Sequence, residues 1–90
     1  MSGTLYGADL GALRALAGKF DKDGETLNGL IQGLNSDTAS SNEIWRGPAA
    51  DRFRNEWTQL KPTLDKFTQT LHEAAKAIRT NADNVEAATR

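Results

Sequence analysis

Two long stretches of this sequence carry apolar or small residues at alternating intervals of three and four, and a short Gly-Pro segment separates them. The first row is Leu10, Leu13, Ala17, Phe20, Gly24, Leu27, Ile31 and Leu34. The second row is Ala50, Phe53, Trp57, Leu60, Leu64, Phe67, Leu71, Ala74 and Ile78. An average period of 3.5 residues places each row along one side of a helix, as in coiled coils. The pattern therefore predicts two long amphipathic helices.

The residues between and before the rows mark where these helices begin. Asp9 is a suitable N-cap for the first helix, and Gly47 followed by Pro48 is a suitable start for the second. We expect an all-α fold with residues 1–90 as a single domain: a helix at about 9–42, a turn at 43–47 and a helix at about 48–86. Pro62 is expected to bend the second helix without shifting the phase of its apolar row.

A lone hairpin of this kind leaves apolar surface uncovered. Helices of about 30 to 40 residues would be roughly 45 to 60 Å long, so the hairpin is a rod that buries one side of each helix. Soluble monomers avoid a long exposed apolar stripe, and two hairpins packed into a four-helix bundle cover it. The side chains expected in the hairpin and dimer interfaces are Leu13, Phe20, Leu27, Ile31, Leu34, Phe53, Trp57, Leu60, Leu64, Phe67 and Leu71.

The composition argues against catalysis and against nucleic-acid binding. The 11 Lys and Arg are scattered and are balanced by 12 Asp and Glu, whereas nucleic-acid binders show a basic patch. With no Cys and one His, His72, there is no recognisable metal-ligand set. The acidic residues Asp21, Asp23 and Glu25 do not have calcium-loop spacing, and a solvated helix face is the simpler interpretation. We expect no catalytic residue, no cofactor, no metal and no small-molecule substrate.

Targeting features are equally sparse. No apolar run approaches the 18 residues of a membrane-spanning helix, and the N-terminus lacks the basic and apolar regions of a cleaved signal peptide. A bilayer-active protein is a further hypothesis, because amphipathic helices can lie on membranes. Mixed charge on the polar faces favours partner helices over lipid.

Trp45 and Gly47 are the candidate functional residues. The structural interpretation is that Trp45 caps the end of the bundle while Gly47 adopts a backbone conformation that other residues avoid. The functional interpretation is that a Trp at a turn marks a recognition surface, because its apolar ring carries a polar N–H.

Trp45-Arg46-Gly47 lies in the middle of a chain with two helical rows, no Cys and no recognisable leader. In these features the chain resembles the WXG family of early-secreted-antigen type, the small type VII secretion substrates of actinobacteria and firmicutes. The resemblance implies a hairpin that dimerises into an antiparallel four-helix bundle, with itself or with a related small WXG-type protein. It implies export in folded form, after folding in the cytoplasm and without a cleaved signal peptide. It also implies selection by a membrane-anchored translocase-like ATPase.

The resemblance further implies a two-part export signal: the Trp-x-Gly turn, here Trp45 and Gly47, and a Tyr-x-x-x-Asp/Glu after the second helix. The sequence departs from the second part, because Val85 and Thr89 stand where the Tyr and the acid are expected. We therefore expect the chain to be the partner of a heterodimer that lacks this part, with a homodimer as the alternative. The alternative function is a cytoplasmic adaptor or chaperone for a larger secreted toxin.

Overall fold

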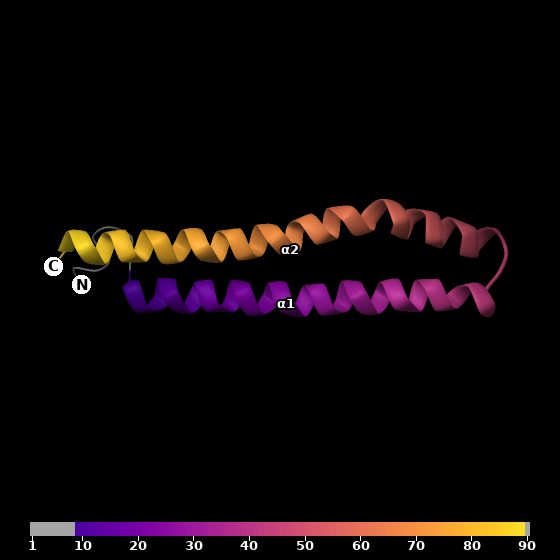
Figure 1. Ribbon diagram of the computed structural model, residues 1–90, viewed down its shortest axis with the longest axis horizontal. Helices are drawn as coiled ribbons and strands as arrows, with labels where there is room; N and C mark the ends of the chain where they lie inside the picture. The colour runs from indigo at the N-terminus through magenta and orange to yellow at the C-terminus, as the bar shows by residue number, and fades with distance from the viewer. Residues whose placement is uncertain (1–8, 90) are drawn as a thin grey trace.

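The protein is an antiparallel hairpin of two long helices. The computed structural model describes residues 9–89, which form α1 (Leu10–Ser40), a short 3-10 helix η2 (Ser41–Glu43) and α2 (Pro48–Thr89), with no strand among them. The two long helices lie side by side in a rod of 64 × 17 × 16 Å (Figure 1). The predicted all-α hairpin is confirmed.

Both long helices begin at residues suited to that position. The Asp9 carboxylate accepts a hydrogen bond from the Ala12 amide at 3.1 Å, which satisfies one of the free N–H groups of the first turn of α1. Gly47 precedes α2 with a φ of 120°, and its carbonyl accepts from the Asp51 amide at 3.0 Å. A side chain at Gly47 would be strained by this backbone conformation, so the position favours glycine.

The contact between the helices is a row of buried residues spaced mostly by seven. On α1 the row is Ala17, Gly24, Ile31 and Thr38. On α2 it is Ala50, Trp57, Thr68, Ala75 and Ala82. Each buried threonine hydroxyl donates to the carbonyl one turn earlier in its own helix, so neither is left unpaired.

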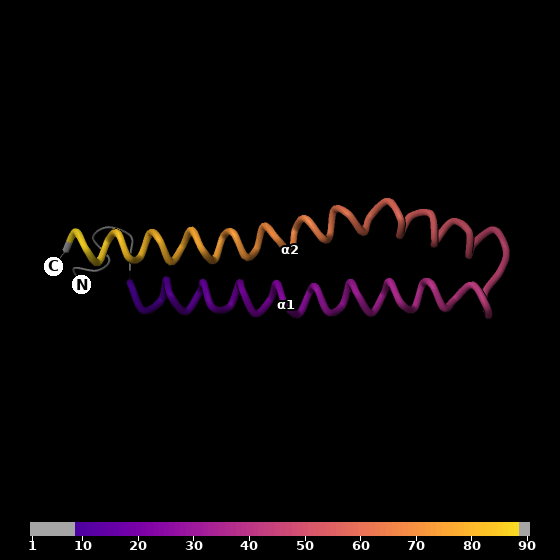
Figure 2. The backbone as a smooth tube through the Cα atoms, in the orientation of Figure 1, coloured from indigo at the N-terminus to yellow at the C-terminus, as the bar shows by residue number. Residues whose placement is uncertain are grey.

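The size of these residues changes along the rod, and the separation of the helices changes with it. Ala17 and Gly24 on α1 and Ala75 and Ala82 on α2 lie in the half distant from the turn, where the two helices run close together. Trp57 lies in the other half, where α2 arches away from α1 (Figures 1 and 2). Small residues allow two helix backbones to approach closely, whereas an indole between them holds them apart.

The apolar row of α2 keeps its spacing across Pro62, as expected from the sequence. Ahead of the proline the buried positions are Ala50 and Trp57, and Leu64 continues this spacing. Beyond the proline, Leu71 and Ile78 continue this spacing as half-buried residues, and the buried residues Thr68, Ala75 and Ala82 each follow one residue of the row by four.

Residues four apart are neighbours on a helix surface, so Thr68, Ala75 and Ala82 belong to the same contact face as Leu64, Leu71 and Ile78. Phe67 beyond the proline is 52% exposed, as Phe53 and Leu60 ahead of it are, at 40% and 48%. Pro62 lies inside α2 without ending it, so the prediction of one continuous helix is confirmed.

Within residues 9–89, neither long helix contains a segment apolar enough to cross a membrane.

Replacing Ala75 by Leu should destabilise the hairpin by about 1 to 3 kcal/mol, because the larger side chain has no room where the helices approach. Ala75 is fully buried, whereas Ala77 on the same helix is exposed, so Ala77→Leu is the matched control. Urea unfolding followed by circular dichroism, at one protein concentration, measures both. Equal stability of the two variants would contradict the packing described here.

Candidate functional site

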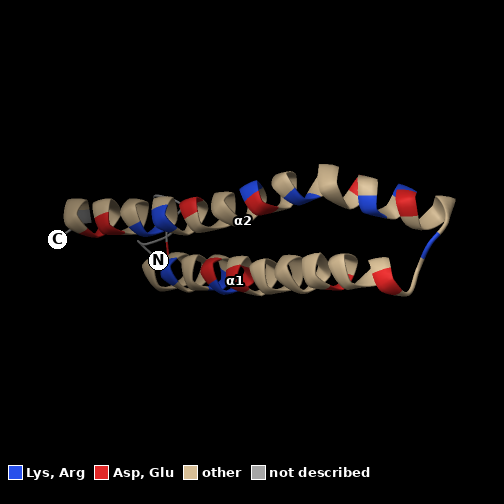
Figure 3. Cartoon of the chain, turned by 45° about the vertical axis from the view of Figure 1, so that its right-hand side comes forward, with Lys and Arg blue, Asp and Glu red and all other residues tan. Residues whose placement is uncertain are grey.

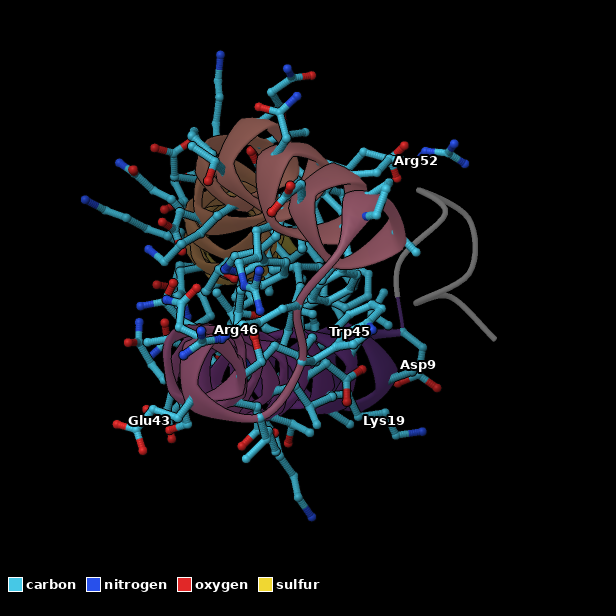
Figure 4. All side chains as sticks on the ribbon, turned by 90° about the vertical axis from the view of Figure 1, so that its right-hand side faces the viewer. Asp9, Lys19, Glu43, Trp45, Arg46 and Arg52 are labelled. Carbon is cyan, nitrogen blue, oxygen red and sulfur yellow. The ribbon has the colours of Figure 1, made fainter. Side chains whose placement is uncertain are left out.

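The turn between the helices presents an apolar tip. η2 reverses the chain, and the Ile44 and Trp45 amides both donate to the Ser41 carbonyl, at 3.1 and 2.8 Å. The Trp45 ring packs against Phe53 of α2 with 5.8 Å between ring centroids and stays 41% exposed. Ile44 beside it is 87% exposed. Figure 4 views this end of the rod and shows Trp45 between the two helices.

Arg54 joins this turn to α2, and the sequence analysis did not single it out. Its Nε donates to the Ser41 hydroxyl at 3.1 Å, and its terminal nitrogen donates to the Ser41 carbonyl at 3.1 Å and to the Trp45 carbonyl. The guanidinium carbon lies 6.0 Å from the Trp45 ring centroid. The side chain is only 19% exposed. The sequence signal that could have revealed Arg54 is an Arg in the second turn of a helix that starts with Gly-Pro.

One flank of the contact row, which we call the apolar flank, consists of large apolar side chains that the hairpin does not cover. They are Leu16, Leu30, Leu34, Phe53, Leu60 and Phe67, each with 40% to 61% of its surface exposed. Leu34, Phe53 and Leu60 each follow a buried residue of the row by three positions, so they share one side of the hairpin. Six of the eight exposed large apolar side chains among the described residues therefore belong to this flank.

The interface residues proposed from the sequence therefore divide into three groups. Ile31 and Trp57 are buried between the two helices. A second group is half-buried beside them: Leu13, Phe20, Leu27, Leu64 and Leu71. The remaining four, Leu34, Phe53, Leu60 and Phe67, are exposed on the apolar flank. The helical period could not separate these groups, because the buried row and the exposed apolar flank occupy adjacent positions on the same helix.

The opposite flank is polar, and three of its four side chains on α1 bond to α2. On α1 these residues each precede a buried residue by three: Arg14, Asp21, Asn28 and Asn35. Asn35 accepts from the indole N–H of the buried Trp57 at 3.0 Å. An indole N–H in this position needs a partner, and Asn35 provides it.

Charged pairs complete this polar flank. Arg14 donates to Asp83 at 2.8 Å and to Glu86 at 2.9 Å, joining the start of α1 to the end of α2. Hydrogen bonds from Arg14 to these two carboxylates raise the pKa of its guanidinium. Both signs of charge occur on both helices, as Figure 3 shows, so opposite charges can pair across the hairpin.

Asp21 has two partners on α2. One carboxylate oxygen lies 2.8 Å from His72 Nδ1 and the other lies 2.7 Å from Arg79. The hydrogen bond with His72, followed by that with Arg79, lowers the pKa of Asp21. A side-chain carbon added at Gly24 would lie 3.1 Å from the His72 ring, so the glycine leaves room for that ring to reach Asp21.

These contacts correct the expectations for Asp21 and His72. The sequence analysis interpreted Asp21 as part of a solvated helix face and considered His72 only as a possible metal ligand, whereas the two side chains are paired between the helices. The seven-residue spacing of the polar positions on α1 could have revealed this flank.

Near the middle of the rod, the polar flank opens into a groove of about 580 Å³. It is lined by Glu25, Asn28, Gly29, Asp65, Thr68, Gln69 and His72. Between Asp9 and Thr89 no group of three or more His, Asp or Glu side chains is arranged to hold a metal ion. Two surfaces of the described chain expose large apolar side chains: the tip at Trp45 and the apolar flank.

Comparison with known proteins agrees with this geometry. The family model for proteins of 100 residues with a Trp-x-Gly motif, WXG100, matches residues 6–89. The chain belongs to the WXG100 family. Its relatives include the type VII secretion system extracellular protein A of Staphylococcus aureus strains USA300 and Newman. Each is 29% identical over 77 residues, which cover 82% of this chain and 76% of the relative.

A solved structure shares the WXG100 hairpin fold. The chain titled Geobacillus thermodenitrificans EsxA crystal form I superposes with a TM-score of 0.82 at 21% identity, covering 90% of each chain. In the present WXG100 chain, the two defining residues of the motif have different structural roles from each other. Gly47 provides the backbone conformation of the turn, and Trp45 provides its partly exposed ring.

Replacing Asp21 by Asn should lower stability at neutral pH and reduce its dependence on acid. Because folding lowers the pKa of Asp21, the unfolded chain binds more protons, and this contribution is lost as pH falls below about 4. Urea unfolding at pH values from about 7 down to about 3 should show the wild type and Asp21→Asn converging at the acid end.

Asp23→Asn is the matched control for this titration, because Asp23 is exposed on the same helix and has no ion pair within residues 9–89. Its curve should follow the wild type throughout. Parallel curves for the wild type and Asp21→Asn would show that the Asp21 contacts do not contribute.

Proposed function

We propose that this WXG100 protein is a non-enzymatic substrate of a type VII secretion system, exported as a folded dimer. The observation that carries the proposal is the Trp45-Arg46-Gly47 turn, which presents a partly exposed Trp at the tip of a long hairpin. Relatives named type VII secretion extracellular proteins support it. The protein would fold in the cytoplasm and leave the cell without cleavage of a signal peptide.

The apolar flank supports the dimer. Burying a Leu or Phe side chain contributes about 1.5 to 3 kcal/mol, and six such side chains stand partly exposed along one side of the hairpin. A second hairpin laid against this side would cover them and form a four-helix bundle. The partner surface must itself be a long apolar stripe, which another WXG-type chain provides.

We favour a heterodimer over a homodimer. The family resemblance places a Tyr and an acid near Val85 and Thr89, and neither is present there. A related chain carrying Tyr-x-x-x-Asp/Glu would bring the second part of the export signal next to the Trp45 turn in an antiparallel bundle. A membrane-anchored translocase-like ATPase would then read both parts together.

An export assay with Trp45→Ala tests the proposal. Export should be lost while the mass of the dimer is unchanged, because Trp45 lies outside the contact row of the two helices. Immunoblots of medium and cell lysate from a strain with its secretion locus intact, with a cytoplasmic marker for lysis, measure export. Arg46→Ala is the control, since the motif leaves the middle position open.

Wild-type protein that stays in the cell under these conditions would refute export. Its recovery there in a stable complex with a larger secreted protein would instead favour the adaptor function.

Leu60→Glu should weaken the dimer by at least about tenfold, because Leu60 is 48% exposed in the hairpin and a buried glutamate would be unpaired. Gln59→Glu, at the adjacent exposed position, introduces the same charge away from the apolar flank and should have little effect. Light scattering over a dilution series, alone and mixed with the partner chain, measures the dissociation constant. Equal affinities for the two variants would place the interface elsewhere.

A further inference from the structure

We propose that Arg54 is the positioning residue of the Trp-x-Gly turn: its guanidinium joins the end of α1 to the turn and holds the Trp45 ring in place. The structural part stands on contacts within the hairpin. The consequence for export rests on the function proposed above.

The first support is the number of acceptors that one side chain reaches. From α2, Arg54 donates to the hydroxyl and the carbonyl of Ser41 and to the carbonyl of Trp45. These acceptors lie at the end of α1 and in the turn, so a single guanidinium bridges three segments. The planar fork of an arginine has five donors, whereas a lysine ammonium is a single point of charge on a flexible stem.

The second support is electrostatic. The last turn of α1 contains no basic residue, although cations are favourable near the carbonyl end of a helix. Arg54 brings a positive charge to that end from the other helix. At 19% exposure its hydrogen bonds are screened less than those of a surface arginine. The nearest carboxylate is Asp51 at 3.7 Å, on its own helix, and it leaves the donors free for the turn.

The third support is the position of the Trp45 ring. It contacts consecutive residues of α2: Phe53, with 5.8 Å between centroids, and Arg54, with 6.0 Å from the guanidinium carbon to the centroid. The second contact has the geometry of a cation–π interaction. Arg54 thus holds both the carbonyl and the ring of the same residue.

The contacts of Arg54 matter because the turn residues alone do not fix the conformation of the turn. Gly47 permits the reversal but does not restrict the backbone to one conformation. Within residues 9–89, only one side-chain hydrogen bond reaches residues 44–47, and it is the bond from Arg54 to the Trp45 carbonyl. Without it, Trp45 would keep its ring contact with Phe53 and the backbone bonds to Ser41 alone.

Arg52 is a matched control for the charge. It lies two residues earlier on α2, is exposed, and projects away from the turn in Figure 4. It makes no hydrogen bond or ion pair with another residue of the described chain. Arg52→Gln removes one positive charge from the same helix end, as Arg54→Gln does, without touching the turn.

The experiment uses the dimer labelled with 5-fluorotryptophan, whose two fluorine NMR resonances report Trp45 and Trp57 separately. Trp45→Phe assigns them. In Arg54→Gln and Arg54→Lys the Trp45 resonance should shift and broaden, and the population of the displaced ring should rise roughly tenfold, as expected for the loss of a hydrogen bond to a charged group. The Trp57 resonance and the dimer mass should not change, and Arg52→Gln should leave both resonances in place.

Two results would overturn the positioning role. One is an unchanged Trp45 resonance in both Arg54 variants. The other is an equal change at Trp57, which would mean that Arg54 stabilises the whole hairpin instead of the turn. A Lys variant that keeps the wild-type Trp45 resonance would show that charge alone is sufficient and would overturn the role of the fork.

The same variants then enter the export assay. Arg54→Lys should reduce export at least about tenfold while Arg52→Gln is exported normally, since a displaced Trp45 presents the wrong surface. Full export of Arg54→Lys despite a shifted Trp45 resonance would overturn the link to export. If the wild type itself is not exported, the proposed function fails, and the NMR result alone then decides the positioning role.

Discussion

The rest of this hairpin depends on the close approach of its two helices. Small residues at seven-residue intervals allow that approach. Ala17 and Gly24 on α1, with Ala75 and Ala82 on α2, occupy the contact row where a larger side chain would push the backbones apart. Because the backbones lie close, side chains on either side of the row can reach across. The contact row therefore determines which side chains of the two flanks can meet.

The two flanks have opposite roles. On the polar flank, Arg14, Asp21 and Asn35 bond to residues of α2, and the different chemistry of these pairs opposes sliding of one helix along the other. A hairpin shifted by one turn would separate Asn35 from the indole of Trp57 and leave that N–H unpaired. On the apolar flank no hydrogen bond or ion pair joins the two helices within residues 9–89, and the large side chains there stay partly exposed. The hairpin thus has a closed side and an open side.

The tip of the hairpin is a third feature, and it depends on backbone conformation and charge instead of helix packing. Gly47 provides a backbone conformation, Pro48 begins α2, and Arg54 supplies a charge that α1 lacks at its end. Trp45 is held by contacts with α2, although it stands nine residues before Arg54 in the chain. In this chain the Trp-x-Gly motif is therefore part of a larger unit that extends into the second helix.

The sequence by itself determined the number of helices, the position of the turn and both helix starts. Those features depend on local rules: the apolar period, the acceptor at Asp9, and the conformational demands of Gly47 and Pro48. It also indicated, through the resemblance carried by Trp45 and Gly47, the family to which the chain belongs.

Only the tertiary structure decided which apolar residues face the other helix and which stay open, because an average period of 3.5 places residues of both kinds along the same side of a helix. It alone paired Asp21 with His72 and Arg54 with the turn. Those partners stand far apart in the chain or meet across a reversal, and their distances depend on how closely the two backbones approach.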